Sequence, residues 1–189
     1  MNSVVKKIKT VYEEWLELPE IVVGEIISNV LHVSPRPAPR HSRASSKLGG
    51  YLDGPFDSIK KGGPGGWIIL DEPELHLESH ILVPDLAGWR RERMPSIPDE
   101  AFFSLIPDWA CEVLSPGTAV LDRVKKMPLY LSLGLKYFWL IDDKIRAIPF
   151  DAIEIELVDL EIFSERNTLT VILNCRHHHP MACRCFCGI

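Results

Sequence analysis

Short apolar runs along the chain alternate with turn-forming residues in a way typical of β-strands. Ser28 and Asn29 separate two of these runs, which predicts a β-hairpin. Pro84 interrupts a later run, so we expect that strand to lie at a sheet edge or to contain a bulge. The last run is apolar on both faces, which indicates a strand inside the sheet. The predicted strands are residues 21–27, 30–33, 67–70, 80–89, 108–114 and 136–141.

Three other segments have helical spacing. Thr10 and Glu13 form a capping-box pattern at the start of the first helix. The second helix follows a predicted proline-rich loop at residues 34–42 and should end at the DGP that follows Leu52. Asp122 is the candidate N-terminal cap of the third helix. The apolar positions of the second and third helices are Ala44, Leu48, Tyr51, Leu52, Val124, Pro128 and Leu131. Because strands and helices interleave, we predict an α/β fold with a mixed sheet.

Composition narrows the class of protein. The chain has 189 residues with 46% hydrophobic content, enough for one compact domain with a real core. Its formal net charge of −5 argues against a protein that coats nucleic acid generally, but a local basic surface stays compatible with it. Neither a signal peptide nor a membrane-spanning run is visible, so we expect a soluble cytoplasmic protein with no membrane partner.

The C-terminal tail differs from the rest of the chain. Four of the five cysteines, at positions 175, 183, 185 and 187, crowd the last fifteen residues, and their spacing is shorter than that of structural zinc ligands. We predict one domain over residues 1–165 and a divergent, poorly packed tail over residues 166–189. A zinc site in the tail remains the alternative.

Acidic residues stand at strand positions, where burial of a charge costs several kcal/mol unless a partner compensates it. Asp85 and Glu112 are two of them, and Asp108 lies four residues before Glu112 on the same predicted strand face. Lys125 and Lys126 follow on the next helix. Converging carboxylates and a lysine suit metal-dependent phosphodiester cleavage, since Mg²⁺ needs only one or two protein carboxylates.

The spacing alone leaves a structural interpretation open. Glu112 could pair with an arginine, and Asp85 could be a turn residue after Pro84. The two lysines could simply form a solvated helix face.

Several separate motifs resemble the Uma family of restriction-endonuclease-like proteins, within the PD-(D/E)XK nuclease superfamily. The resemblance covers about residues 11–160. It is carried by "LPEIVVGEIISNVLHVSPRPAPRHSRASSKLGGYL", "GGPGGWIILDEPELHL", "VPDLAGWRRERMP", "PDWACEVLSPGTAVLDRVKKMPLYLSLGLKYFWLID" and "PFDAIEIEL". It implies a restriction-endonuclease-like mixed sheet flanked by helices. The chain departs from the family after Asp143, where the strand pair that usually precedes the "PFDAIEIEL" segment is expected to be missing, and in its tail.

The resemblance also implies roles for individual residues. Asp85 matches the metal-binding aspartate and Glu112 the second acid. Leu114 occupies the usual lysine position, so the lysine would be supplied by the next helix as Lys126, four residues after Asp122. Glu25 matches a recurrent family glutamate and is a predicted further ligand or supporting carboxylate. Asp122, and Asp108 from its spacing alone, are predicted supporting carboxylates.

These observations predict a Mg²⁺- or Mn²⁺-dependent DNA endonuclease, expected to enclose DNA as a homodimer. Arg90, Arg91 and Arg93 are candidate phosphate contacts, although they could equally be surface charge neutralised in part by Glu92. One alternative is a catalytically decayed relative that binds nucleic acid or itself, which the shortened sheet and the unmatched tail favour. Another is a metal enzyme acting on a small molecule with the same carboxylates.

Overall fold

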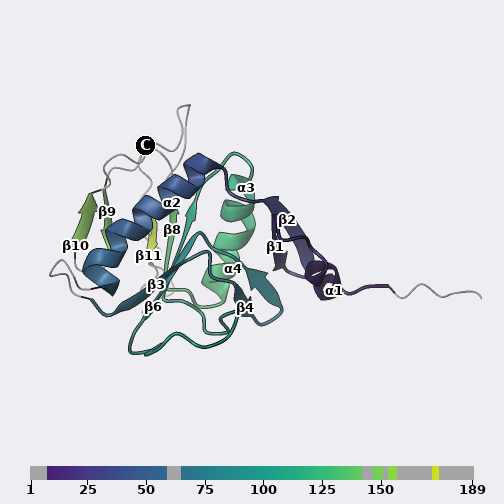
Figure 1. Ribbon diagram of the computed structural model, residues 1–189, viewed down its shortest axis with the longest axis horizontal. Coiled ribbons are helices and arrows are strands. Elements are labelled where there is room, and N and C mark those ends of the chain that lie inside the picture. Colours follow the sequence, from purple (N-terminus) through teal and green to yellow (C-terminus); the bar gives the residue numbers. More distant parts are fainter. Residues whose placement is uncertain (1–7, 59–64, 142–146, 151–152, 157–171, 175–189) are drawn as a thin grey trace, which may run out of the picture.

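A five-stranded mixed sheet forms the centre of the computed structural model (Figure 1), which describes residues 8–58, 65–141, 147–150, 153–156 and 172–174. The strand order is β11-β8-β7-β6-β3, in which β7 and β8 are parallel and the other neighbours are antiparallel. The strands are β3 (Trp67–Asp71), β6 (Leu86–Arg90), β7 (Trp109–Val113), β8 (Tyr137–Ile141) and β11 (Ile172–Asn174). The predicted mixed sheet is confirmed, and β8 is an interior strand as expected.

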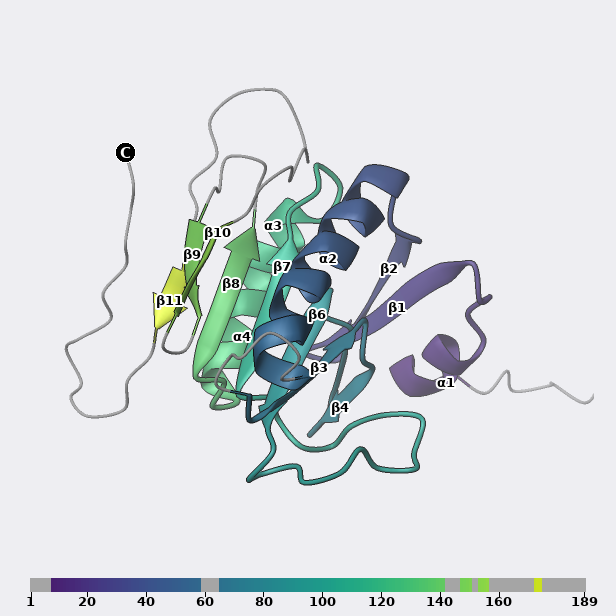
Figure 2. The ribbon, with the colours of Figure 1, turned by 60° about the vertical axis from the view of Figure 1, so that its left-hand side comes forward.

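Helices cover both faces of this sheet (Figure 2). One face packs against α2 (Pro39–Leu52), and the other packs against a continuous helical segment made of α3 (Ala119–Leu121), η2 (Asp122–Lys126) and α4 (Met127–Ser132). Alternate residues of β7 face opposite ways. Trp109, Cys111 and Val113 share the core with α2, whereas Ala110 and Leu114 share the core with Tyr130 of α4. Glu112 has the same parity as Ala110, so its carboxylate faces the segment that carries Lys126.

A second, antiparallel sheet has the order β2-β1-β5-β4. Its strands are β1 (Val22–Ile27), β2 (Val30–Pro35), β4 (Leu75–Leu77) and β5 (His80–Leu82), and α1 (Val11–Leu16) lies beside β1 and β2. The predicted hairpin is confirmed, and Ser28 and Asn29 have φ angles of 51° and 60°, which a two-residue type I′ turn requires. The predicted capping box of Thr10 and Glu13 is also present.

The predicted strand at residues 80–89 is wrong, because the chain divides there between the two sheets. β5 pairs with β1 and β4, whereas β6 pairs with β3 and β7. Val83, Pro84 and Asp85 form the connection, and proline there needs no ladder partner for an N–H. Asp85 therefore lies where the two sheets meet.

Three helix predictions also need correction. β2 extends to Pro35 and α2 begins at Pro39, so only residues 36–38 of the predicted loop 34–42 are irregular, and proline suits the first helical position. The DGP after Leu52 does not end the helix, which continues as a π-helical turn, η1 (Asp53–Asp57). The third helix begins after Thr118, so Asp122 lies inside it and does not cap it. The buried side of this helix carries Asp122, Lys126 and Tyr130. The predicted apolar stripe is not the buried side, since its Val124 is 65% exposed.

The C-terminal part contains more structure than expected. β9 (Ala147–Phe150) and β10 (Ile153–Glu156) form a hairpin that includes most of the PFDAIEIEL motif, so the strand pair expected to be missing before that motif stays a prediction. β11 lies inside the predicted tail and pairs with β8. The tail cysteines lie outside the described residues. Within the described part of the chain, no helix is long and apolar enough to cross a membrane.

Candidate active site

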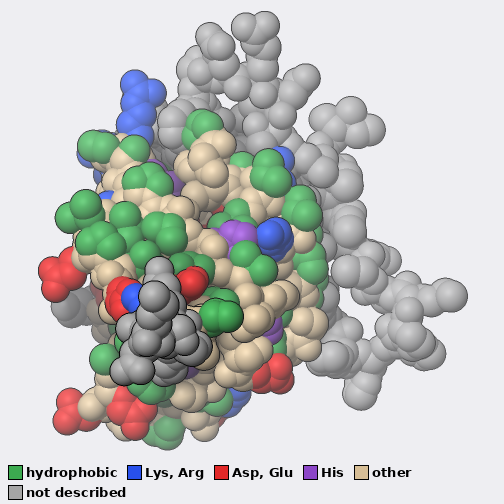
Figure 3. All heavy atoms as spheres, turned by 90° about the vertical axis from the view of Figure 1, so that its right-hand side faces the viewer, with side chains coloured by type: hydrophobic (Ala, Val, Ile, Leu, Met, Phe, Trp, Pro, Cys, Tyr) green, Lys and Arg blue, Asp and Glu red, His purple; other side chains and the backbone are tan. Residues whose placement is uncertain are grey.

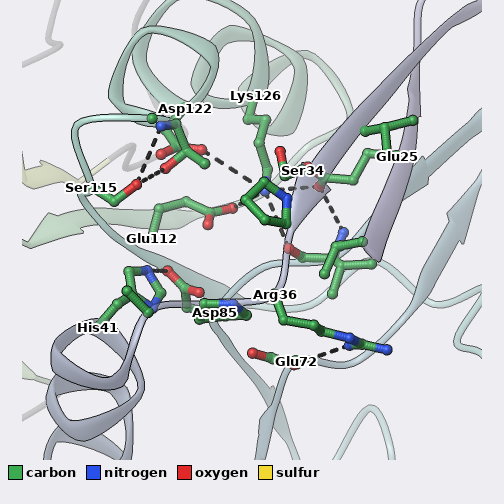
Figure 4. A pocket seen from close by; sticks show the side chains of 18 of the residues that line it. Glu25, Ser34, Arg36, His41, Glu72, Asp85, Glu112, Ser115, Asp122 and Lys126 are labelled. Atoms are coloured by element: carbon green, nitrogen blue, oxygen red, sulfur yellow. Dashed lines mark hydrogen bonds and ion pairs between the residues drawn. The ribbon is translucent and has the colours of Figure 1, made fainter. Parts of the chain in front are cut away.

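A cavity of about 480 Å³ opens where the two sheets meet (Figure 4). Its walls come from β1, β2, the start of α2, the connection between β5 and β6, the end of β7 and the helix that follows β7. The ionisable side chains that line it are Glu25, Arg36, His41, Glu72, Asp85, Glu112, Asp122 and Lys126. Residues from distant parts of the sequence therefore supply one concentrated set of charges.

Lys126 lies at the centre of this set and is 3% exposed. Its Nζ is 2.6 Å from Oε1 of Glu112 and 2.8 Å from Oε1 of Glu25, and it donates a hydrogen bond to the carbonyl of Val83 at 3.2 Å. Burial alone would lower the pKa of Lys126, but Glu112 and Glu25 raise it well above its usual value. Lys126 is therefore a fixed ammonium.

Lys125 points away from this set, in agreement with the choice of Lys126 that the family resemblance implied. Its side chain is exposed, and its Nζ is 3.4 Å from Nε2 of His32 on β2. The helix therefore directs Lys126 inward and Lys125 outward.

Glu112 is 3% exposed, and its surroundings disfavour the ionised form of its carboxyl. Burial raises the pKa of Glu112 well above its usual range, Lys126 opposes the rise, and Asp122, Asp85 and Glu25 add to it. Oε1 accepts no hydrogen bond from the described residues, although the Lys126 ammonium lies within ion-pair distance. Oε1 therefore has lone pairs that could coordinate a cation.

Asp85 is held from two sides. Its Oδ2 accepts a hydrogen bond of 2.6 Å from the amide of Val113 and lies 3.1 Å from Nε2 of His41. The same Nε2 is 2.7 Å from the carbonyl of Val113. Burial would lower the pKa of His41, but the hydrogen bond to Asp85, the charge of Asp85 and the contact with Val113 outweigh burial and raise it. His41 thus fixes the orientation of Asp85 against the end of β7.

Asp122 is the third buried carboxyl of the cavity, beside Glu25 and Glu112, and lies 4.0 Å from Nζ of Lys126. Burial raises its pKa from 3.8 to about 6, although Lys126 and a hydrogen bond from Thr118 oppose the rise. Thr118 is itself held by Ser115, whose Oγ is 2.9 Å from Oγ1 of Thr118. The turn after β7 therefore orients Asp122.

We expect Asp122 to make the free energy of unfolding fall as the pH rises from about 4 to about 6. The raised pKa means that the folded protein holds this proton more tightly than the unfolded chain does, so the stabilisation is present at low pH and is lost as the pH passes through the folded-state pKa. The rise from 3.8 to about 6 corresponds to about 3 kcal/mol. Urea denaturation of wild type and Asp122→Asn across this range measures it. A stability difference between the two proteins that does not change with pH would contradict the assignment.

The charges of the cavity do not balance. Apart from the Arg36–Glu72 pair, the cavity contains four carboxyl groups, from Glu25, Asp85, Glu112 and Asp122, and one ammonium, from Lys126, and His41 adds positive charge only when protonated. Hard divalent cations bind carboxylate oxygens, and Mg²⁺ keeps most of its waters. Among the described residues no group of three or more His, Cys, Asp or Glu side chains forms a ready cation cage. A cation held by one or two carboxylates and water is compatible with the carboxyl groups of the cavity.

Asp108 lies at the other end of β7 and does not line the cavity. Its carboxylate pairs with Arg93 at 2.8 Å and Lys136 at 3.1 Å and accepts a hydrogen bond from the amide of Arg90. Burial opposes these partners, but together they lower the pKa of Asp108. The prediction that Asp108 supports the metal ligands is not met by this geometry.

The three predicted phosphate contacts are engaged within the protein. The guanidinium of Arg90 lies 4.1 Å from the centre of the Trp67 ring, Arg91 pairs with Asp57, and Arg93 pairs with Asp108. None of the three lines the cavity.

Three residues of the cavity were not predicted from the sequence: His41, Ser115 and Thr118. His41 was assigned to a loop, whereas it lies on the buried side of α2 with Ala44 and Leu48. The spacing of these three positions, three and then four residues, was the available signal. Ser115 and Thr118 belong to the SPGT turn, whose hydroxyl spacing is typical of a turn that precedes a helix.

Comparisons with known proteins agree with the fold and with the expected family. The chain is similar in fold to the crystal structure of a "putative nuclease belonging to DUF820" from Anabaena variabilis ATCC 29413, with 22% sequence identity, a TM-score of 0.60, and coverage of 88% of this chain and 84% of that one. A comparison with curated proteins finds no match. The model of the Uma2 family, described as "Putative restriction endonuclease", matches residues 12–171. Since this match spans most of its length, the chain belongs to the Uma2 family.

Proposed function

We propose that this protein is a divalent-metal-dependent endonuclease that hydrolyses phosphodiester bonds in DNA. The observation that carries the proposal is the convergence of Asp85, Glu112 and Lys126 in one cavity with an excess of carboxylates. Membership of the "Putative restriction endonuclease" family supports the same chemistry. Mg²⁺ or Mn²⁺ is the proposed cofactor, with Asp85 and Glu112 as its ligands.

A bound divalent cation would activate a water molecule and offset the charge of the phosphate. His41 and the amide of Val113 both hold Oδ2 of Asp85 in position. Lys126 supplies a permanent positive charge next to Glu112 and is too strongly protonated to act as a general base. Glu25, Glu112 and the carbonyl of Val83 keep the ammonium in place. Glu25 and Val83 would still hold it when Glu112 binds a cation.

The geometry favours this function over catalytic decay. A decayed site would not need to keep three carboxyls and an ammonium buried together beside the partly buried Asp85, because such burial is costly. We also propose a homodimer. Each chain carries this cavity, so a dimer would present two sites, one to each strand of a duplex.

Incubation of supercoiled plasmid with purified protein and Mg²⁺ or Mn²⁺ tests the proposal. We expect wild type to convert plasmid to nicked and then linear DNA, and we expect EDTA to abolish the conversion. Asp85→Ala should be slower by roughly a thousandfold, because a lost metal ligand removes several kcal/mol of transition-state stabilisation.

The matched control is Glu72→Gln, since Glu72 lines the rim of the same cavity but is exposed. It should cleave at the wild-type rate. Equal cleavage by wild type and Asp85→Ala would reveal a contaminating nuclease, and no cleavage by any preparation would favour the decayed-relative alternative.

A further inference from the structure

α2 carries three basic side chains on one flank. Arg40, Arg43 and Lys47 are spaced three and four residues apart, so they share one side of the helix, and all three are exposed. The buried side, which includes His41, Ala44 and Leu48, is turned away from them by roughly a quarter to a third of a turn. We call these three residues the α2 basic stripe.

The α2 basic stripe has no counter-charge. The helix contains no aspartate or glutamate over its 14 residues. Within the described residues, Arg40, Arg43 and Lys47 make no ion pair, hydrogen bond or ring contact, whereas every other lysine or arginine there has a partner. Those others are Lys9, Arg36, Arg90, Arg91, Arg93, Arg123, Lys125, Lys126 and Lys136. In a chain of net charge −5, this concentration of unpaired cations on one helix flank indicates an anionic partner.

The stripe begins beside the cavity. His41, the neighbour of Arg40, reaches Asp85 from the first turn of the same helix. From Arg40 to Lys47 the helix rises about 10.5 Å, which spans about three phosphates along one strand of a duplex. Figures 1 and 2 show α2 lying over the central sheet with no described element across its outer side. A nucleic acid strand that follows the stripe would therefore run toward the carboxylates.

The rest of the exposed side favours nucleic acid over a membrane surface. A helix that lies on a membrane needs apolar side chains on the face that enters the lipid. Apart from Pro39 at its start, the exposed positions of α2 are Arg40, Ser42, Arg43, Ser46, Lys47 and Gly50. Hydroxyl and basic side chains are the common contacts of nucleic acid phosphates.

We infer that the α2 basic stripe is the surface that binds the phosphate backbone of the DNA and leads it to the cavity. This rests on the proposed function, which it deepens by naming the substrate-binding surface. Figure 3 shows another face of the molecule, where basic side chains are interspersed with acidic and apolar ones. The stripe takes the role that the sequence analysis gave to Arg90, Arg91 and Arg93.

The test is the salt dependence of binding to a fluorescein-labelled 20-base-pair duplex, measured by fluorescence anisotropy in EDTA from 50 to 300 mM NaCl. The stripe variant is Arg40→Gln/Arg43→Gln/Lys47→Gln, which removes the charges but keeps good helix formers. We expect the slope of log K against log salt to become shallower by about 2.7, about 0.9 for each lost phosphate contact. Affinity at 100 mM NaCl should fall roughly tenfold or more.

The matched control is Lys9→Gln/Arg91→Gln/Lys136→Gln, which removes the same charge from exposed residues that have internal partners. It should keep the wild-type slope to within about 1. An equal loss in both variants, an unchanged slope in the stripe variant, or no duplex binding by wild type would overturn the inference. Loss of sedimentation with phosphatidylserine vesicles, with duplex binding unchanged, would overturn it in favour of a membrane.

The inference and the proposed function can fail separately. Duplex binding that depends on the stripe, without plasmid cleavage by wild type, would contradict the nuclease proposal and support the stripe as a DNA-binding surface. Metal-dependent cleavage with an unchanged KM in the stripe variant would support the nuclease proposal and overturn the stripe.

Discussion

Replacement of Lys126 by methionine should lower the free energy of unfolding by about 3–5 kcal/mol, because it removes the one ammonium from a cluster of buried carboxyls. Glu112 and Glu25 lose an ion pair each, and the carbonyl of Val83 loses a hydrogen-bond donor. Methionine is similar in length and unbranched, so packing changes little. Urea denaturation at pH 7 measures the loss.

Lys125→Met is the matched control for this prediction. Lys125 is exposed and contacts only His32 among the described residues, so its loss should change the free energy of unfolding by less than about 0.5 kcal/mol. The double variant Lys126→Met/Glu112→Gln should regain part of the lost stability, since it leaves one fewer unpaired carboxylate. Equal stability of Lys126→Met and Lys125→Met would contradict the buried charge network.

Mn²⁺ should raise the melting temperature of wild type by roughly 5–10 °C when it is present at about a hundred times its Kd. A bound cation would relieve the mutual repulsion of Asp85 and Glu112, which raises the pKa of Glu112 in addition to the effect of burial. Asp85→Ala should show no such shift, whereas Glu72→Gln should show the full one. Differential scanning fluorimetry compares the three proteins. The same shift in wild type and Asp85→Ala would move the cation to another site.

The core of the site could be predicted because it depends on local periodicity and on the family resemblance. Strand parity directs Glu112 toward the following helix, and helical spacing directs Lys126 rather than Lys125 inward. The register of Lys126 four residues after Asp122 brings both to the same side of the helix. Each of these relations spans only a few residues.

The missed and misplaced residues depend on contacts between distant segments. His41 reaches Asp85 and Val113 only because α2 crosses the end of β7, and three nearby prolines concealed the start of that helix. Arg91 and Arg93 appeared to be free surface charges because their partners lie 34 and 15 positions away in the sequence. The division of residues 80–89 between two sheets likewise depends on strand pairing that spacing along the chain does not reveal.

The most direct test of the account is the number of Mn²⁺ ions bound per chain, measured by electron paramagnetic resonance of free Mn²⁺ during a titration. We predict at least one saturable site in wild type and in Glu72→Gln that Mg²⁺ displaces, and its loss in Asp85→Ala. Circular dichroism of each variant confirms that it is folded before the titration. If wild type binds no Mn²⁺, or if folded Asp85→Ala binds it as tightly as wild type, Asp85 and Glu112 do not form a metal site and the proposed mechanism is wrong.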